Sequence, residues 1–494
     1  MTILINILVF LVVFMFIVIV HGFGHFIFAQ VFGVKVHEFA IGFGPQIYRK
    51  AGKKTDFRIN AFPLGGYVRL KGEDPTEEES PDSLYGVSAW KRFIILLAGP
   101  AFSILAGYLL FILIIGVWGY KPIVIDKVIP NSPAEQSGLR SGDLIIKING
   151  KYVFDIADMT DMIRKGKTVT FEISRNGKTQ EITVFPQLTT QQFEFIVEDA
   201  KGELGGKILS INNMELPVYM EKWQKEFVTI KSESGELSGI LSNVSVTQER
   251  YAIGIYYGQF SNVFAKDTEF FSKGDKLLQV NDFPINSSND LFDAVTSLTL
   301  KPDEIYISTN GTVIDTIITP SGNDVRILYE SKGEIKEITL SKEKFIEILS
   351  IPGVLESQSV TIKPKGLQNI TLAVQRSNRL ALYIWKSLPG IFVGKNLDEV
   401  AGPLGMVQII GEAAQVGLET ILTIIAIITI NLGIFNLFPL PALDGGRIIF
   451  ALIEMISRKK INRNIENWIH AIGFFLLIGL LIFITFMDIG RLFM

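Results

Sequence analysis

The sequence contains no cysteine and only four histidines among its 494 residues. The lack of cysteine excludes folds stapled by disulfides, and it excludes zinc or iron–sulfur sites with thiolate ligands. Any metal site built from imidazoles must therefore draw on His21, His25, His37 or His470. Charged residues make up 20% of the chain, which is below the share of about 25% in soluble domains. The net charge of −3 gives no reason to expect a nucleic-acid partner.

Apolar residues are in excess, at 48% of the chain with a mean hydropathy of +0.34. The excess is concentrated in four segments near the two ends, at residues 3–20, 93–118, 421–437 and 469–486. About 20 apolar residues are enough to cross a bilayer as a helix. A cleaved signal peptide is the alternative for the first segment, but no Lys or Arg precedes it and no small-residue cleavage site follows it. The pattern therefore predicts four transmembrane helices.

Two loops rich in Lys and Arg orient these helices. The loop at residues 35–92 carries ten such residues, and the short loop after the third segment carries five more. The positive-inside rule places such loops in the cytoplasm. Residues 35–92 and 438–467 are therefore predicted to be cytoplasmic, while the N-terminus, the long middle region and the C-terminus face the outer side.

The middle region contains an internal repeat. Residues 130–150 read PNSPAEQSGLRSGDLIIKING, and residues 273–284 read KGDKLLQVNDFP. A shift of 132 residues aligns Gly142-Asp143 with Gly274-Asp275. Each copy predicts a turn, a short strand, a turn that contains Asn, and a helix. Residues 191–245 between the copies are interpreted as a connector.

The first copy resembles a bacterial PDZ domain, whose signature is a Ser-Pro-Ala…Gly-Leu…Gly-Asp-x-Ile run. The second copy lacks the Ser-Pro-Ala part. PDZ domains bind peptides by strand addition, so the resemblance implies that peptide or protein ends bind these modules. The alternative is that the modules only shield the membrane face or space other domains.

His21 and His25 continue the first apolar segment. Residues at i and i+4 lie on one face of a helix, so both imidazoles can reach one metal ion. Histidines at bilayer depth are costly unless they line a polar cavity or bind a ligand. A pair of satisfied polar residues at a helix–helix contact is the alternative. A catalytic zinc usually has three protein ligands, so a third ligand is needed.

The third apolar segment runs into Asn436-Leu-Phe-Pro-Leu-Pro-Ala-Leu-Asp444-Gly-Gly-Arg. Two prolines prevent a continuous helix here, and Gly445 and Gly446 let the backbone turn. A carboxylate beside a broken segment in the membrane is a candidate functional group. Asp444 is therefore the best third ligand, although it could instead cap the helix that follows.

The His-x-x-x-His pair, the Asn436…Leu-Asp-Gly turn and the intervening PDZ-like copies resemble the site-2 protease family, peptidase family M50. The similar branch is the bacterial regulator-of-sigma-E proteases, which are intramembrane zinc metalloproteases. The segments at 39–45 (FAIGFGP) and 63–68 (PLGGYV) resemble the family's membrane-reentrant β-hairpin. Residues 90–100 are similar to the start of the family's second span, and residues 402–405 are similar to the stretch before its third span.

The resemblance implies site residues, a cofactor and partners. His21, His25 and Asp444 carry over as ligands of a zinc ion. Substrate-binding positions carry over onto Asn436, Pro439, Gly65 and Gly66. The implied partners are the lipid bilayer and protein substrates with a single transmembrane helix, such as anti-sigma factors or remnant signal peptides. The implied location is a bacterial cytoplasmic membrane.

The expected fold is a multi-pass α-helical membrane protein with about four transmembrane helices and two inserted PDZ-like α+β domains. The expected parts are a first membrane part at 1–118, PDZ-like domains at 119–190 and 246–350, a connector at 191–245, an outer amphipathic segment at 351–418, and a second membrane part at 419–494.

The sequence departs from the family pattern at Gly22. The family motif is His-Glu-x-x-His, in which the Glu is the general base, and glycine has no side chain to take that role. General acid–base catalysis contributes roughly 10²–10⁴-fold, so we expect little or no proteolysis. Gly22 is interpreted as an introduced substitution, a sequence error, or the mark of a natural pseudoprotease that binds membrane proteins as a chaperone or adaptor. A metal transporter is a weaker third hypothesis.

Four further residues are weaker candidates for the site. Ser103 stands where the family often has Asn, which weakens any role there. Glu38 is a poor substitute for the missing base, because it lies beyond the predicted helix. His37 is expected in a loop, and His470 is expected at the membrane interface.

Overall fold

The computed structural model describes residues 2–492 except 53, 75–76, 78, 130, 190–191, 215–224, 248–249, 259, 311–312, 358–359, 365 and 393–401. Pro130, which opens the first copy of the repeat, and residues 393–401 in the expected outer segment lie outside the described residues. The chain divides into two compact units, Met1–Tyr120 with Lys363–Met494, and Lys121–Ile362.

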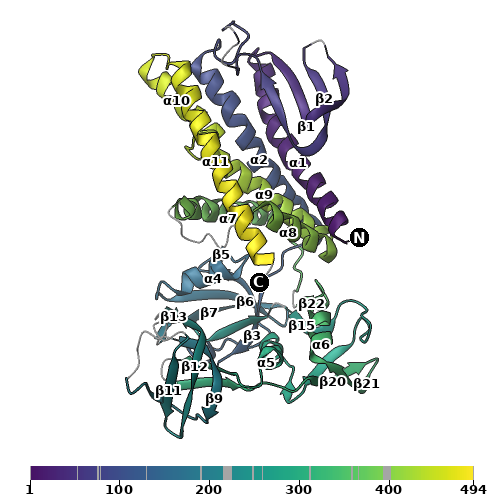
Figure 1. Ribbon diagram of the computed structural model, residues 1–494, viewed down its shortest axis with the longest axis vertical. Helices are drawn as coiled ribbons and strands as arrows, with labels where there is room; N and C mark the ends of the chain where they lie inside the picture. Colours follow the sequence, from purple (N-terminus) through teal and green to yellow (C-terminus); the bar gives the residue numbers. More distant parts are fainter. Residues whose placement is uncertain are drawn as a thin grey trace. The chain divides into compact units, whose positions relative to one another are not determined.

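The first unit is a helical bundle (Figure 1). Among the described residues, four helices contain spans long and apolar enough to cross a membrane: α1 (Thr2–Val31), α2 (Ala89–Trp118), α9 (Leu418–Leu437) and α11 (Arg463–Leu492). The prediction of four helices long and apolar enough to cross a membrane is confirmed. The first helix runs 11 residues past Val20, the last residue of its apolar run, and it contains His21 and His25, as expected from their spacing.

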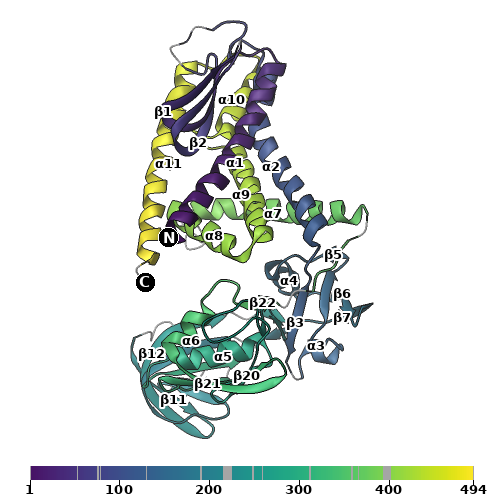
Figure 2. The same ribbon diagram turned by 90° about the vertical axis from the view of Figure 1, so that its right-hand side faces the viewer.

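Three more helices complete the bundle: α7 (Gln368–Phe392), α8 (Pro403–Val416) and α10 (Asp444–Ser457). Figures 1 and 2 show α7 running across the bundle at the end opposite to α10. α7 carries apolar side chains on more than one face, because Ala373 and Leu388 are buried whereas Leu382, Tyr383 and Trp385 are exposed. Its apolar exposed face is the kind that a membrane surface covers.

Strands β1 (Val36–Ala51) and β2 (Asp56–Leu70) form a small sheet beside α1 (Figure 2). Both strands bend, and the first half of β1 lies between the two halves of β2, so that Phe39 pairs with both Phe57 and Val68. Gly42 and Gly65 supply the positive φ angles at the bends, +80° and +96°. The segments that resemble a β-hairpin therefore do form two consecutive antiparallel strands, and this pair is folded over on itself.

The second unit contains both copies of the repeat. The first copy consists of β3 (Ile123–Val128), α3 (Pro133–Gln136), β4 (Leu144–Ile148), β5 (Lys151–Tyr152), α4 (Ile156–Ile163), β6 (Val169–Arg175) and β7 (Lys178–Val184). The second consists of β15 (Phe260–Phe264), β16 (Lys276–Val280), β17 (Phe283–Pro284), α5 (Ser288–Thr299), β20 (Asp324–Ser331), β21 (Glu334–Ser341), α6 (Lys342–Leu349) and β22 (Leu355–Ser357). Both copies contain the order strand, short strand, helix, strand and strand, which agrees with the repeat in the sequence, whereas α3 in the first copy and α6 with β22 in the second have no counterpart.

A third sheet occupies the stretch interpreted as a connector. It contains β9 (Gln192–Gly202), β10 (Ile208–Ile211), β11 (Phe227–Ser232) and β12 (Gly235–Thr247), and it is completed by β18 (Ile305–Asn310) and β19 (Val313–Ile318) from within the second copy. Buried Phe193, Phe195, Val197 and Ile230 form its core. The connector interpretation missed this sheet, because β9 pairs with β18 across more than a hundred residues and no local pattern records that pairing.

The described strands also cross the expected domain boundaries. β8 (Gln187–Thr189) pairs with β13 (Arg250–Ala252), and β14 (Ile255–Gly258) returns to the first copy, where it is the edge strand beside β3. Residues 250–258 therefore pair with the first copy, although the sequence suggests a second module from residue 246.

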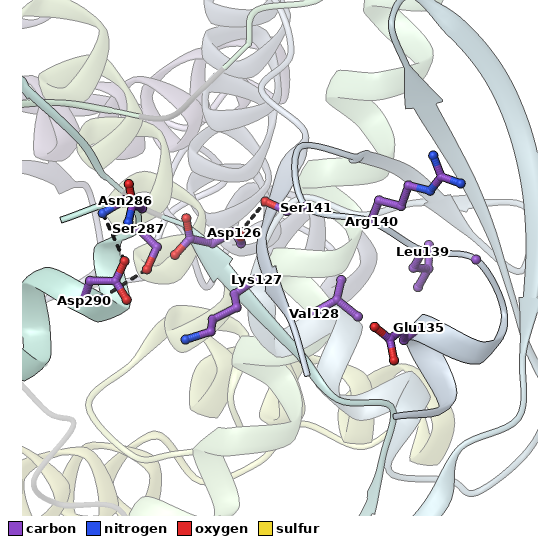
Figure 3. A pocket seen from close by; sticks show the side chains of 11 residues that line it. Asp126, Lys127, Val128, Glu135, Leu139, Arg140, Ser141, Asn286, Ser287 and Asp290 are labelled. Atoms are coloured by element: carbon purple, nitrogen blue, oxygen red, sulfur yellow. Dashed lines mark hydrogen bonds between the residues drawn. The ribbon is translucent and has the colours of Figure 1, made fainter. Parts of the chain in front are cut away.

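A direct contact joins the two copies. Asp126 Oδ2 on β3 accepts hydrogen bonds from the backbone N–H and the hydroxyl of Ser288, at 3.1 and 3.2 Å, at the start of α5. A polar cavity of about 760 Å³ lies beside this contact and is lined from both copies (Figure 3). The N-terminal end of α5 favours a carboxylate, so Asp126 ties the second copy to the first.

Candidate metal centre

Two imidazoles lie on one face of α1 towards its C-terminal end. His21 and His25 are half-buried, and their ring centroids are 5.0 Å apart. Both rings face α2. The Cβ that Gly24 lacks would lie 2.3 Å from the carbonyl oxygen of Ala98, and a Cβ on Gly99 would lie 2.1 Å from His25 Nε2. These glycines let α1 and α2 approach closely enough for the imidazoles to sit between them.

Asp444 reaches the same place from the broken segment that follows α9. The chain turns through Ala442, which has a φ of +72°, and α10 begins at Asp444. A Cβ on Gly445 would lie 2.1 Å from the carbonyl oxygen of Phe438, and one on Gly446 would lie 2.5 Å from that of Leu440. The glycine pair therefore folds the first turn of α10 against the turn that precedes it.

Three ligand atoms converge at this point. Asp444 Oδ2 lies 3.1 Å from His21 Nε2 and 3.3 Å from His25 Nε2, and the two Nε2 atoms are 3.3 Å apart. Ligand atoms about 2.0–2.1 Å from a tetrahedral zinc lie about 3.3–3.4 Å from one another. The triangle therefore has the size of one face of a zinc tetrahedron.

Hydrogen bonds on the far side of each ring orient the nitrogens. His25 Nδ1 donates to the carbonyl oxygen of Ile95 at 2.9 Å, so Nε2 of the neutral ring carries a lone pair. Ser103 Oγ donates to the carbonyl oxygen of Gly99 at 3.3 Å and lies 3.2 Å from His21 Nδ1. The hydroxyl can therefore accept the Nδ1 proton of His21, which leaves the Nε2 lone pair for a metal.

The donor set fits a divalent cation. Asp444 Oδ2 is buried and has no hydrogen-bond partner among the described residues. Two nitrogen lone pairs and a carboxylate oxygen that face one another repel, and a buried charge without a partner is costly. A cation at the centre of the triangle removes both costs. Two imidazoles and a carboxylate form a known set of ligands for catalytic zinc.

Position 22 follows His21 directly on α1, about 100° further round the helix, so it lies beside the face that carries the two imidazoles. A Cβ at Gly22 would point towards the sheet, 3.1 Å from Val68 Cγ2 and 4.0 Å from Phe39 Cε2. Among the described residues, the three-residue cluster itself supplies one carboxylate, that of Asp444. A general base is therefore missing from the position where the family motif places one.

The positions predicted to bind substrate are spread around this cluster. Asn436 is half-buried in the last turn of α9, and Pro439 is exposed just after it. Gly65 and Gly66 lie on β2, which packs beside α1, and a Cβ on Gly66 would lie 2.6 Å from the carbonyl oxygen of Ala40. Among the described residues, none of these four makes a hydrogen bond to the three ligands.

The remaining candidates from the sequence are engaged elsewhere. Glu38 is buried, accepts a hydrogen bond from Tyr67 and pairs with Arg58 and Arg69, so it cannot replace the missing base. His37 Nε2 lies 3.7 Å from Glu77 Oε1.

Two residues matter more than the sequence suggested. The Ser103 hydroxyl contacts His21, although its role was expected to be weakened. His470, expected at the interface, accepts the backbone N–H of Ala442 at 2.8 Å and so supports the turn before Asp444. Neither contact has a local signature, because the first joins residues 82 positions apart and the second joins residues 28 positions apart in the sequence.

Gly99 offers a direct test of this geometry. We expect Gly99→Ala to weaken zinc binding by about 10-fold or more, because its Cβ would displace His25 and perturbed support of a ligand typically costs 10–100-fold. Equilibrium dialysis against a zinc buffer measures this. Gly479→Ala is the matched control, since a Cβ there meets open space on another membrane helix. Equal affinities in both variants would contradict the geometry.

Comparison with known proteins shows which proteins the chain is similar to. The model of "Peptidase family M50" matches residues 9–480. A Thermotoga maritima protein named "Putative zinc metalloprotease" is 42% identical over 487 residues, which cover 96% of this chain and 97% of that protein. The regulator of sigma E protease of Haemophilus influenzae is 26% identical over 486 residues, with 96% of each chain covered.

A solved PDZ domain protein from Parabacteroides distasonis also matches, at 9% identity over 48% of this chain and 94% of that one. Its TM-score of 0.12 is too low to carry an argument about the fold. The family match, by contrast, spans nearly the whole sequence. The resemblance found in the sequence is thus confirmed, and this chain belongs to peptidase family M50.

Proposed function

We propose that this chain has the architecture of a site-2-type intramembrane metalloprotease and binds zinc through His21, His25 and Asp444. The observation that carries the proposal is the triangle of ligand atoms with edges of 3.1, 3.3 and 3.3 Å. The ligands come from membrane helix α1 and from the start of α10, directly after membrane helix α9. Membership of family M50 supports the same conclusion.

The proposed chemistry divides between the metal and the chain. Zinc held by such a ligand set supplies Lewis-acid activation of water for hydrolysis. The hydrogen bonds from His25 Nδ1 to the Ile95 carbonyl oxygen and from His21 Nδ1 to the Ser103 hydroxyl hold the two imidazoles in the tautomer that presents Nε2. Asn436, at the end of α9, has an amide that can both donate to and accept from an unwound substrate backbone.

Gly22 limits what the site can do. No side chain at this position can take a proton from water, and Glu38 is held by its three partners. We therefore propose that the chain as written is inactive or nearly inactive in proteolysis. The alternative function is a non-catalytic chaperone or adaptor that binds membrane proteins without cutting them, and the observation that favours it is Gly22 itself.

The proposed substrates are membrane proteins with a single transmembrane helix, such as anti-sigma factors or remnant signal peptides. The two repeat copies are proposed to be PDZ-like modules that bind peptide or protein ends. Their terminal strands support this role, because β14 and β22 lie at the edges of their sheets. A free strand edge is what strand addition requires.

Restoring the carboxylate tests the proposed function. We expect Gly22→Glu to cleave a model single-span substrate in detergent at least about 100-fold faster than the chain as written, because it regains a general base. The substitution should be tolerated, since the nearest atom to the new Cβ is the end of the Val68 side chain. Gel analysis of the cleavage products measures the rate.

Two controls make this result specific. Gly22→Gln has nearly the same size but no base, so it should not cleave, and a zinc chelator should stop cleavage by Gly22→Glu. Equal cleavage by all three forms would refute the role of position 22. A zinc-loaded Gly22→Glu that binds substrate without cutting it would favour the adaptor function.

We also propose that the second unit lies on the outer side of a bacterial cytoplasmic membrane, and that residues 35–92 and 438–467 are cytoplasmic. The charge asymmetry of the loops supports this orientation. Because the chain has no cysteine, single introduced cysteines report it cleanly.

Thr179 on β7 and Ser457 at the end of α10 are both exposed. A membrane-impermeant maleimide should label Thr179→Cys in intact spheroplasts, whereas Ser457→Cys should react only after permeabilisation. Labelling in the reverse order would invert the proposed topology. The unmodified chain is the blank, since it has no thiol to react.

A further inference from the structure

Arg447 follows Asp444 by three residues on α10, so the two side chains leave the same face of the helix. Arg447 Nη1 donates to Glu73 Oε1 at 2.6 Å. Glu73 belongs to the loop between β2 and α2, which is 374 residues earlier in the chain. This ion pair therefore connects the β2–α2 loop to the first turn of α10, which begins with the proposed ligand Asp444.

Glu73 is itself held in place. Its Oε2 accepts the backbone N–H of Leu70 at 3.4 Å, and its own N–H donates to the carbonyl oxygen of Leu70 at 3.2 Å. Arg463, at the start of α11, donates to the carbonyl oxygens on both sides of it, those of Gly72 and Asp74. The carboxylate therefore projects from a backbone that is fixed on two sides.

The same loop is anchored further along. The guanidinium carbons of Arg92 and Arg463 lie 4.7 and 4.8 Å from the centroid of the Tyr85 ring. The Tyr85 hydroxyl donates a hydrogen bond to Glu466 at 2.8 Å. Burial raises the pKa of Tyr85, as does the neighbouring Glu466, so the phenol keeps its proton and remains a donor. Such cation–π and charge-assisted contacts hold the loop as a rigid support.

The first turn of α10 has little other polar support. Its N-cap residue, Leu443, makes no side-chain hydrogen bond to the helix, and Gly445 and Gly446 contribute no side chains. The Arg447 guanidinium is held by the fixed Glu73 carboxylate. This contact restricts the rotation of the first turn of α10 about the helix axis. That rotation decides whether Asp444 Oδ2 reaches the two imidazole nitrogens.

We propose that Glu73 is a positioning residue, which acts through Arg447 to hold Asp444 in the geometry that completes the three-ligand metal site. This inference rests on the proposed metal site. It adds that the ligand geometry is set by a carboxylate in the loop, outside the motifs that carry the ligands. Among the described residues, no hydrogen bond or ion pair joins Glu73 to the three ligand atoms.

Cobalt(II) titration of the full-length chain in detergent tests this proposal, because the visible absorption of cobalt reports both affinity and coordination geometry. We expect Glu73→Gln to weaken cobalt binding by about 10-fold and to change the absorption band. The double exchange Glu73→Arg with Arg447→Glu should restore both. Glu79→Gln is the matched control, since Glu79 pairs with Lys460 at 2.8 Å but beyond the other end of α10.

The outcomes separate this inference from the proposed function. If the unmodified chain binds no cobalt, the metal site itself fails, and the inference fails with it. If the unmodified chain binds cobalt and Glu73→Gln matches it in affinity and spectrum, the positioning role is refuted while the metal site stands. If Glu73→Gln does not fold, as judged by gel filtration, Arg447→Lys provides the same comparison and keeps a charge at that position.

Discussion

Three atoms with lone pairs, two imidazole nitrogens and one carboxylate oxygen, lie within 3.3 Å of one another inside the membrane unit. Such an arrangement is unfavourable without a cation, so the surrounding structure has to hold it. The glycines at 24 and 99 bring α1 and α2 together, and the Gly445-Gly446 pair folds α10 back to meet them. The contacts of Ile95, Ser103 and His470 then fix the rings and the turn.

The proposed loss of catalysis concerns a position that supplies no metal ligand. The ligands, their hydrogen bonds and the close helix approaches are all compatible with a metal, whereas position 22 offers no proton acceptor and faces the apolar side chains of the β1–β2 sheet. We therefore propose that metal binding and proteolysis are separable in this chain. A chain that binds the metal but lacks the base would suit the proposed binding role.

Local patterns in the sequence predicted part of this picture. The four apolar runs predicted the membrane helices, and the i, i+4 histidine spacing predicted that His21 and His25 share a face. Asp444 could be identified from its broken, glycine-rich surroundings and from the family resemblance. Local patterns could not predict that Gly99 makes room for His25 or that Ser103 contacts His21, because both depend on how α1 crosses α2. The third sheet was missed for a similar reason, since β9 and β18 meet only in the folded chain.

The central claim is that His21, His25 and Asp444 bind one zinc ion. Zinc-edge X-ray absorption of the purified, zinc-loaded chain tests it most directly, because the method reads the identity and distance of the ligand atoms. The account predicts one zinc per chain with two imidazole nitrogens and oxygen ligands at about 2.0–2.2 Å, and loss of that signal in His21→Ala. A chain that binds no zinc, or a zinc environment unchanged by His21→Ala, would contradict it.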